Sequence, residues 1–288
     1  MIGIIGGTGL YGLEGFTLEK EEHPETPWGK ASDPIRLGTI ETEKGKVKLA
    51  FLSRHGAGHR ILPSEIPQKA NLASLKMLGV KRIIAFSAVG SLKEEIAPGH
   101  FAVPNQIIDR TRHREDTFFG DGVVAHVSFG DPFCPDLNHV SVNAISKCNI
   151  PCHEKETLVC MEGPAFSTRA ESKLYKSWGA GLINMSVLPE AKLARELEIC
   201  YQMICMSTDY DSWRESEEAV TAEEIMKIVK QNSENAIKVL QAMLPHLAEI
   251  QEKECSCHHA LQFSIITAPE KRKQETVQKL HTVLPKYF

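Results

Sequence analysis

The chain has 288 residues, of which 42% are hydrophobic and 24% are charged, as is typical of a globular protein with one large domain or two small ones. Its 33 Lys and Arg residues and 37 Asp and Glu residues give a net charge of -4, which excludes a basic surface field for nucleic acid. The first residues lack the basic region of a signal peptide, and no apolar run approaches the length of a membrane span. We therefore expect one large domain in the cytoplasm, or also in the nucleus of a eukaryote, that binds neither membrane nor nucleic acid.

The first predicted element is an apolar strand that begins at Ile2 and runs into Gly6-Gly7-Thr8-Gly9. Glycines at this point let backbone N–H groups approach an anion, and the Thr8 hydroxyl adds a donor. Residues 7–12 also match a dinucleotide-binding fingerprint, but the following segment, 21–27, is not a crossover helix. A loop that binds phosphate is favoured over one that binds NAD, and a plain glycine turn remains open.

Residues 47–52 predict the next strand, which leads into Arg54 and His55. A guanidinium offers a planar fork to phosphate oxygens and an imidazole offers a further donor, although a solvated loop also fits. His59 lies four residues after His55, but two glycines between them disfavour a helix and no acid completes a metal site. Zinc is not expected here.

A helix is predicted over 67–78, with Gly79 as its C-terminal cap, and a strand over 83–86 leads into Ser87-Ala88-Val89-Gly90-Ser91. Three strand ends then carry groups that suit an anion: Thr8, Arg54 with His55, and Ser87. If these ends meet at one edge of a sheet, they form one binding site.

The middle of the chain predicts a strand at 101–108, a charged segment at 109–115, and His126 on a short run between two turns. The acids within 109–115 favour a solvated, salt-bridged loop over a basic patch. A single His on such a run is usually structural. Further strands are predicted at 157–161 and 182–186.

Phe166 follows the first of those two strands, and Pro189 starts a helix after the second. An aromatic ring at this place can stack on a base or fill the core. From Phe166 alone, core packing is favoured.

The apolar run from Ile204 predicts a buried strand that ends in Thr208-Asp209-Tyr210-Asp211. In open parallel sheets, ligands bind outside the carboxyl ends of the strands, so Asp209 and Asp211 would face a crevice. Two such acids could hold a polar heterocycle. An Asx turn also explains them and is slightly favoured on this stretch alone.

Residues 221–224 form a capping box for a long amphipathic helix, and the density of apolar residues falls after Pro245. We therefore divide the chain into a domain at 1–246 and an extension at 247–288. The extension holds Cys255-Ser256-Cys257-His258-His259, which could chelate a metal, form a tight disulfide or make no contacts. A peripheral role is favoured for it.

Six motifs follow one another from the N-terminus to about Leu244: Gly6-Gly7-Thr8-Gly9, Ser53-Arg54-His55-Gly56, Ser87-Ala88-Val89-Gly90-Ser91, Glu162-Gly163-Pro164, Asn184-Met185-Ser186 and Thr208-Asp209-Tyr210-Asp211. Together they resemble the S-methyl-5'-thioadenosine phosphorylases of the purine nucleoside phosphorylase superfamily. The resemblance implies a single α/β domain with a central mixed β-sheet flanked by helices, assembled as a trimer, with no metal and no organic cofactor. It also implies that 5'-methylthioadenosine and inorganic phosphate, the co-substrate, give adenine and 5-methylthioribose 1-phosphate in purine and methionine salvage.

The resemblance also assigns roles to individual residues. The phosphate-binding positions are Thr8, Arg54, His55, Ser87, Ala88 and Ser186. The nucleoside-binding positions are Phe166, Ile183, Asn184, Met185, Asp209, Asp211, Ala222, Ile225, Met226 and His126. Phe166 would pack on the purine, and Asp209 and Asp211 would read N7 and the 6-amino group. Ala222, Ile225 and Met226 would form the 5' pocket, and His126 would reach in from a neighbouring subunit.

The chemistry of the reaction fits these assignments. Breaking the glycosidic bond builds positive charge on the ribose, which a phosphate held by Arg54 and His55 stabilises. Adenine leaves poorly as an anion, so Asp209, kept protonated by burial, is our candidate to protonate N7, while Asp211 accepts from the 6-amino group. These two roles could be exchanged. A pair of acids should also reject 6-oxo purines by roughly 10⁴-fold.

Some positions depart from the family pattern. Ala165 stands in place of an Arg, Ile66-Pro67-Gln68-Lys69 in place of an Asn-Tyr-Arg run, and Ser87 and Ser186 in place of Thr. The Cys255-x-Cys257 pair resembles a disulfide pair of archaeal members that form hexamers, which implies two stacked trimers. The alternatives are a hydrolytic nucleosidase or a phosphorylase for other 6-amino or 6-oxo purine nucleosides, and, outside the superfamily, an NAD-dependent oxidoreductase or a non-catalytic nucleotide-binding module.

Overall fold

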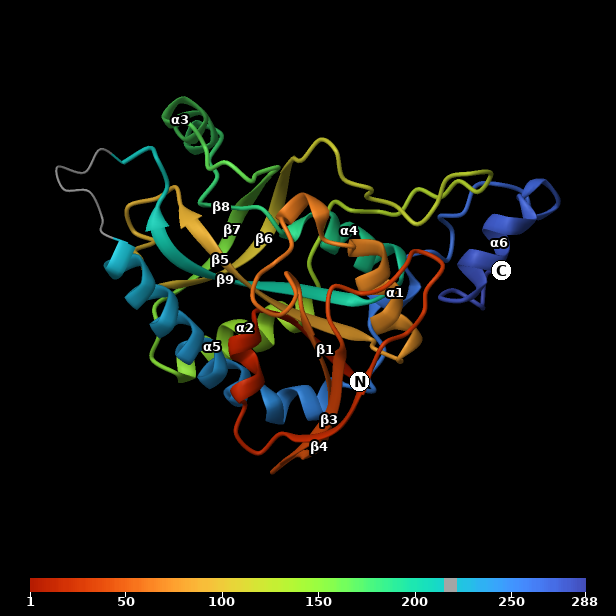
Figure 1. The fold of residues 1–288 in the computed structure, drawn as a ribbon, viewed down its shortest axis with the longest axis horizontal. Coiled ribbons are helices and arrows are strands. Elements are labelled where there is room, and N and C mark those ends of the chain that lie inside the picture. Colours follow the sequence, from red (N-terminus) through yellow and green to blue (C-terminus); the bar gives the residue numbers. More distant parts are fainter. Residues whose placement is uncertain (215–221) are drawn as a thin grey trace.

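The computed structural model describes residues 1–214 and 222–288, apart from the side chains of Thr8 and residues 222–225. Within these residues, one mixed sheet of nine strands runs in the order β2-β3-β4-β1-β5-β8-β7-β6-β9 (Figure 1). Strand β9 also pairs with β5, so the second half of the sheet closes on itself. The strands are β1 (Ile2–Gly6), β2 (Thr17–Glu22), β3 (Ile35–Thr42), β4 (Gly45–Ser53), β5 (Arg82–Ser91), β6 (Phe101–Arg110), β7 (Cys152–Met161), β8 (Leu182–Asn184) and β9 (Cys200–Tyr210).

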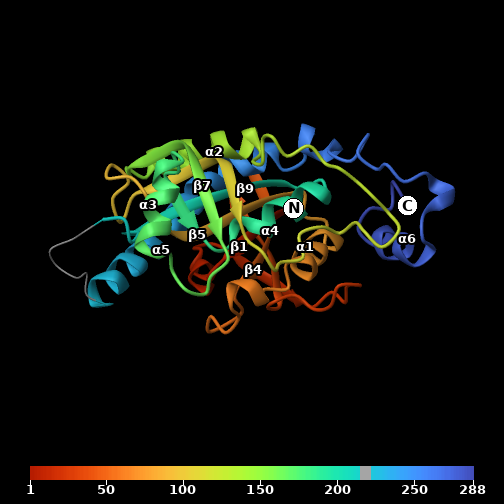
Figure 2. The ribbon, with the colours of Figure 1, turned by 90° about the horizontal axis from the view of Figure 1, so that it is seen from above.

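Helices cover both faces of the sheet (Figures 1 and 2). The described residues form α1 (Gln68–Met77), α2 (Pro135–Lys147), α3 (Arg169–Ser177), α4 (Val187–Glu196), α5 (Ala222–Ile250) and α6 (Gln274–His281). Helices α1 and α4 contribute to one apolar cluster, and α2 and α5 contribute to a second. None of these helices has both the length and the apolar character needed to span a bilayer. The expected fold class, a central mixed sheet flanked by helices, is confirmed.

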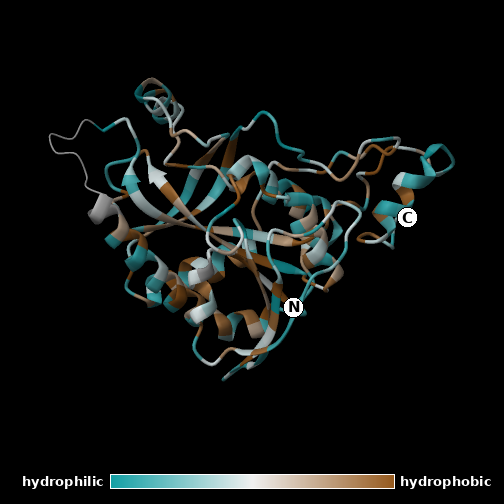
Figure 3. Cartoon of the chain, in the orientation of Figure 1, coloured by the Kyte–Doolittle hydropathy of each residue, from teal (hydrophilic) through white to brown (hydrophobic). Residues whose placement is uncertain are grey.

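The two apolar clusters supply most of the core. Leu72 of α1 and Leu193 of α4 belong to the first cluster, and Leu137 of α2 and Leu240 of α5 belong to the second, all fully buried. Burying such a side chain contributes about 1.5 to 3 kcal/mol. Figure 3 shows hydrophobic colours along the central strands and mainly polar colours on the outer turns. The strand ends are therefore held in place by a packed interior.

Most predicted elements are present, with shifted ends. The strands expected at 47–52, 101–108 and 157–161 lie within β4, β6 and β7, and the helix expected at 67–78 is α1. The strand predicted from Ile204 begins earlier, at Cys200, and β9 ends at Tyr210, within the predicted motif. Asp209 is therefore a strand residue, held by backbone pairing.

The C-terminal extension packs on the rest of the chain. Helix α5 passes through Pro245 and ends at Ile250, so the boundary predicted after residue 246 falls inside a helix. The short 3-10 helices η3 (Ser256–His259) and η4 (Pro269–Lys271) and helix α6 follow. Leu280 and Val283 join the first apolar cluster, and Cys255 and Cys257 join the second.

Candidate active site

Strand β5 is the element along which the predicted site residues converge. Gly90, near its end, pairs with Ile183 of the antiparallel strand β8 on one side and with Asp209 of the parallel strand β9 on the other. Ser87 lies three residues earlier on the same strand. At a rise of about 3.3 Å per residue, the two positions are about 10 Å apart. One strand therefore carries the predicted phosphate end and the predicted purine end of the site.

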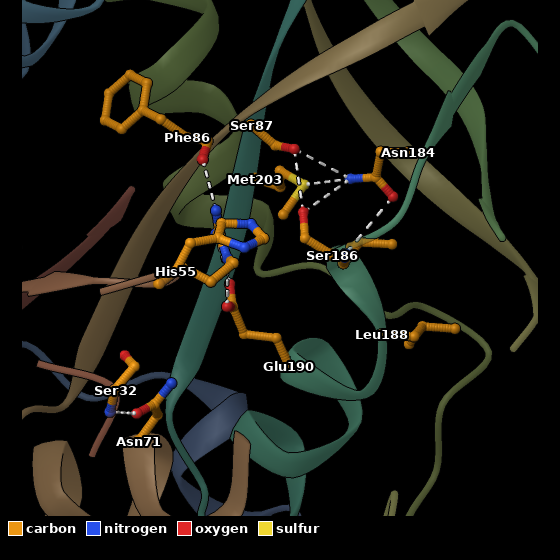
Figure 4. A network of polar contacts seen from close by, with 12 residues as sticks. Ser32, His55, Asn71, Phe86, Ser87, Asn184, Ser186, Leu188, Glu190 and Met203 are labelled. Atoms are coloured by element: carbon orange, nitrogen blue, oxygen red, sulfur yellow. Dashed lines mark hydrogen bonds and ion pairs between the residues drawn. The ribbon is translucent and has the colours of Figure 1, made fainter. Parts of the chain in front are cut away.

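Hydroxyl and amide groups cluster at the Ser87 end (Figure 4). The Ser87 Oγ lies 3.1 Å from the Ser186 Oγ, and the Asn184 Nδ2 lies 3.3 Å from the first and 3.4 Å from the second. All three side chains are buried, whereas Ala88, the next residue of β5, is exposed. The structure thus brings three residues predicted from two separate motifs into one patch of hydrogen-bonding side chains.

The Arg54 guanidinium lies beside this patch. Its Nη1 donates to the carbonyl oxygen of Phe86, the residue before Ser87, at 2.9 Å. Its Nε and Nη2 donate to the two carboxylate oxygens of Glu190 at 2.8 and 3.0 Å. These bonds use three of the five guanidinium N–H groups. The planar fork expected to bind phosphate is therefore occupied by a protein carboxylate, and two N–H groups remain without a partner among the described residues.

Glu190 fixes both the position and the charge of Arg54. The pair is buried, with side-chain exposures of 3% for Arg54 and 0% for Glu190. Burial by itself lowers the pKa of Arg54, but the charge and hydrogen bonds of Glu190 reverse this and raise it. The Tyr201 hydroxyl donates a third bond to Glu190 at 2.7 Å. Arg54 is therefore a rigid, permanently charged group.

His55 follows Arg54 and is neutral at pH 7. Its Nδ1 lies 2.8 Å from the carbonyl oxygen of Ile61, which can only accept, so Nδ1 carries the proton. Burial lowers the pKa of His55 to about 4, and the charges of Arg54 and His59 add to this effect. The ring of His59 stacks on it with centroids 4.1 Å apart. The remaining nitrogen, Nε2, presents a lone pair rather than the donor expected from the sequence.

The acid pair gathers around Gly90. A Cβ atom at this glycine would lie 3.3 Å from the Asp209 Oδ1, 3.3 Å from the Asp211 Cβ and 3.1 Å from the Ile183 Cγ2. A β-bulge in the pairing of β5 with β9 produces this approach, since Val89 and Gly90 pair with Ser207 and Asp209 and leave Thr208 over. Both acids and Ile183 therefore lie close to Gly90.

The burial of Asp209 favours its protonated form. The Thr208 hydroxyl donates to the Asp209 Oδ2 at 2.7 Å and lies 3.2 Å from the carbonyl oxygen of Val89. Burial raises the pKa of Asp209, the charge of Asp211 raises it further, and the bond to Thr208 offsets part of the rise.

Asp211 is in a different situation. Its side chain is 7% exposed, and its Oδ2 has no hydrogen-bond partner among the described residues. Its backbone N–H donates to the carbonyl oxygen of Ser91 at 3.1 Å, which fixes the residue just past the end of β9. A buried carboxylate oxygen of this kind calls for a donor. An amino group of a ligand would supply one.

Comparison with known proteins places this geometry in a family. The sequence model described as the phosphorylase superfamily matches residues 1–245. The S-methyl-5'-thioadenosine phosphorylase of Emericella nidulans is 50% identical over all of this chain and 83% of its own length. That of Koribacter versatilis is 47% identical over all of this chain and 96% of its own. The chain belongs to the S-methyl-5'-thioadenosine phosphorylase family.

Solved structures agree with this membership. The crystal structure of a methylthioadenosine phosphorylase from an antarctic soil metagenomic library matches with a TM-score of 0.93 and 44% identity, over 99% of this chain and 98% of its own. A variant of adenosine/methylthioadenosine phosphorylase from Schistosoma mansoni, crystallised with methylthioadenosine, matches with a TM-score of 0.81 and 30% identity, over 95% of this chain and 99% of its own. The family named from the motifs is confirmed.

In this phosphorylase, a buried arginine joins the loop after β7 to the turn before α4. The Arg114 side chain is 3% exposed and donates to the carbonyl oxygens of Glu162, Met185 and Leu188, each at 2.6 Å. The prediction of a solvated loop over 109–115 is therefore wrong at Arg114. Carbonyl oxygens of two distant segments accept hydrogen bonds from its guanidinium inside the protein. Arg114 positions the segment that carries Asn184 and Ser186.

Two other residues of the site were not predicted from the sequence. Glu190, on α4, binds Arg54 although the two are 136 residues apart. Tyr201, on β9, donates a hydrogen bond to Glu190 and so supports that contact. An acid inside the otherwise apolar run of α4 is a signal that could have pointed to Glu190. Nothing comparable marks Tyr201, which sits in an apolar strand.

The remaining predicted residues of this phosphorylase lie apart from the cluster or are not described. Phe166 is 81% exposed and Met226 is 65% exposed, so their contacts with a nucleoside stay predictions. The side chains of Thr8, Ala222 and Ile225 lie outside the described residues. Met185 packs against Gly163, where a Cβ would lie 2.5 Å from its sulfur. His126 is exposed, and its backbone N–H donates to Ser264 in the C-terminal extension at 2.9 Å.

Proposed function

We propose that this chain converts 5'-methylthioadenosine and inorganic phosphate into adenine and 5-methylthioribose 1-phosphate. The observation that carries the proposal is the pair of unlike acids at Gly90, about 10 Å along β5 from the Ser87 hydroxyl cluster. This spacing suits a nucleoside with its base at one end and phosphate at its anomeric carbon. The names of the full-length relatives support the same reaction.

At the phosphate end, the hydroxyls of Ser87 and Ser186 and the two remaining N–H groups of Arg54 hold the anion. A phosphate oxygen then bonds to C1' of the ribose as the bond from C1' to N9 breaks. Positive charge that develops on the ribose is stabilised by the bound phosphate. His55 Nε2 accepts a hydrogen bond from the P–O–H group of hydrogen phosphate, since a neutral ring with a lone pair fits a protonated oxygen.

At the purine end, Asp209 donates its proton to N7, so adenine leaves as a neutral molecule rather than as an anion. The raised pKa of Asp209 supports this role, since the acid must be protonated when substrate binds. The unpaired Oδ2 of Asp211 accepts from the 6-amino group. A 6-oxo purine would place an acceptor against that oxygen and be rejected by roughly 10⁴-fold.

The proposal extends to the assembly and setting of the enzyme. The reaction uses no organic cofactor and no metal, and the chain acts as a trimer in which His126 contacts the substrate of a neighbour, with a hexamer as a second form. The exposure of His126 and the bridge between Ala125 and Ile265, which holds its segment to the extension, support this role. We place the enzyme in the cytoplasm, in purine and methionine salvage, with small molecules as its ligands.

The experiment is a phosphate-dependence assay. Adenine release from 5'-methylthioadenosine should require phosphate, and ³¹P NMR should detect the sugar phosphate. Asp209→Asn should lower kcat by about 10²- to 10⁴-fold, the usual contribution of a general acid. Asp136→Asn, an exposed acid on α2, is the matched control and should be unaffected. Adenine release that runs equally fast without phosphate would instead identify a hydrolytic nucleosidase, and full activity of Asp209→Asn would remove that residue from the mechanism.

A further inference from the structure

Four buried cysteines meet at a point that the proposed reaction does not use. The sulfurs of Cys134, Cys200, Cys255 and Cys257 all lie within 4.8 Å of one another, and each residue is at most 9% exposed. All four are free thiols. Cys148 and Cys152 are also free thiols, but they are only partly buried and lie outside the cluster.

The four residues come from three separate parts of the chain. Cys134 is the N-cap of α2, Cys200 is the first residue of β9, and Cys255 and Cys257 lie in the extension. In the sequence only Cys255 and Cys257 stand close together, and a metal, a disulfide and no contact were all open for them. The fold supplies the two missing partners.

The spacing of the sulfurs is that of a tetrahedral metal site. The Cys134 and Cys255 sulfurs are 3.8 Å apart. In a zinc site with four thiolate ligands, Zn–S bonds of about 2.3 Å at the tetrahedral angle place neighbouring sulfurs about 3.8 Å apart. Thiolates are soft ligands that select zinc over magnesium or calcium. We propose that these four cysteines bind one structural zinc ion.

The surroundings can accept the charge of such a site. Zinc displaces four thiol protons, which leaves the ion with its four thiolates at a net charge of about -2. Cys134 lies at the N-terminus of α2, a 13-residue helix whose dipole favours a negative group there. The His258 Nε2 lies 3.4 Å from the Cys200 sulfur, within hydrogen-bond distance. Metal sites with thiolate ligands commonly carry such second partners.

A buried arginine positions the segment that supplies two of the ligands. The Arg82 guanidinium donates to the carbonyl oxygens of Gln251 at 3.2 Å and Lys253 at 2.6 Å, just before Cys255. The zinc would therefore tie the extension to the start of β9 and to α2. Since Asp209 lies near the other end of β9, the ion stabilises the fold and takes no part in the reaction. This departs from the expectation that the chain binds no metal.

The test is the metal content of the whole protein. An untagged chain, produced in medium with added zinc and purified under reducing conditions, should carry about one zinc per chain by inductively coupled plasma mass spectrometry. Replacement by cobalt should give the thiolate charge-transfer and d–d bands of a tetrahedral site. The double variant Cys255→Ser with Cys257→Ser should lose the metal, while the control Cys148→Ser with Cys152→Ser should keep it.

Three outcomes would overturn the proposal. One is wild-type protein with far less than one zinc per chain. The second is a disulfide between Cys255 and Cys257, or between Cys134 and Cys200, found by peptide mapping of the protein purified under the same reducing conditions. The third is a serine variant that retains its zinc. Where that variant does not fold, the cobalt spectrum of the wild type decides, because a spectrum without thiolate bands excludes the site.

Discussion

Replacing Glu190 with Gln should weaken phosphate binding and lower stability together. The carboxylate accepts two bonds from Arg54 and one from Tyr201, in surroundings where both charged groups are almost fully buried. Removing one partner of a buried ion pair costs about 3 to 5 kcal/mol, because the other charge stays buried without compensation. The amide keeps one acceptor oxygen, so we expect a loss near the lower end, about 3 kcal/mol.

The effect on phosphate follows from the same contacts. Without the two-point contact with Glu190, the guanidinium is no longer fixed in its position beside Phe86 and Ser87. A hydrogen bond to a charged group contributes about 1.5 to 3 kcal/mol, so KM for phosphate should rise by about 10- to 100-fold. KM for 5'-methylthioadenosine should change far less, because the acid pair at Gly90 does not contact Glu190.

Steady-state kinetics with each substrate varied in turn, together with urea unfolding, measure both effects. Glu198→Gln is the matched control, since Glu198 is a buried acid, 2% exposed, that pairs with Lys286 and accepts the Leu261 N–H away from the site. It should lose stability while keeping the wild-type KM for phosphate. If Glu190→Gln behaves in the same way, Glu190 is only structural and our account of the anion site is wrong.

Three further results are expected. Ser186→Ala should raise KM for phosphate by about 10-fold or more through loss of a hydrogen bond to an anion, whereas Ser186→Thr, which keeps the hydroxyl, should stay near wild type in the same kinetic assay. The pKa of His55, followed by NMR, should rise from about 4 toward its ordinary 6.5 when phosphate is added, because an anion favours the charged ring, and an unchanged value would place phosphate elsewhere. Burial raises the pKa of Glu196 from its ordinary 4.5 to about 7, so the folded state binds this proton more tightly than the unfolded state does. The resulting contribution to the free energy of unfolding is complete below pH 4.5 and is lost as pH rises through 7. At about 1.4 kcal/mol per pH unit the loss is roughly 3 kcal/mol, and Glu196→Gln should flatten the dependence of the urea midpoint on pH between 5 and 8.

The parts of the site that depend on local pattern could be predicted from the sequence. Apolar runs followed by polar residues mark β1, β4 and β5, and the rule that ligands bind at strand ends predicts that Thr8, Arg54 with His55, and Ser87 meet at one edge of the sheet. The resemblance to a family then added Asn184 and Ser186 and assigned Asp209 and Asp211 to the purine. In the structure, Arg54 donates to the residue before Ser87, and the Ser87 hydroxyl lies within hydrogen-bond distance of Ser186.

The parts that depend on contacts between distant segments could not be predicted. Arg54 was expected to turn its fork to phosphate, yet the fork is held by Glu190, 136 residues away, and no local pattern links them. Arg114 looked solvated among other charges, but carbonyl groups of two loops bind it inside the protein. The bulge at Thr208 is likewise a property of strand register, which depends on pairing with β5.

The surroundings of the two acids favour one of the two assignments that the sequence left open. Asp209 and Asp211 are equivalent in the linear order, and either could protonate N7. Burial raises the pKa of Asp209 and the charge of Asp211 raises it further, although the hydrogen bond that Thr208 donates offsets part of the rise. Asp211 has an oxygen without a donor among the described residues and so suits the amino group. These two differences are the reason why we propose Asp209 as the acid and Asp211 as the acceptor.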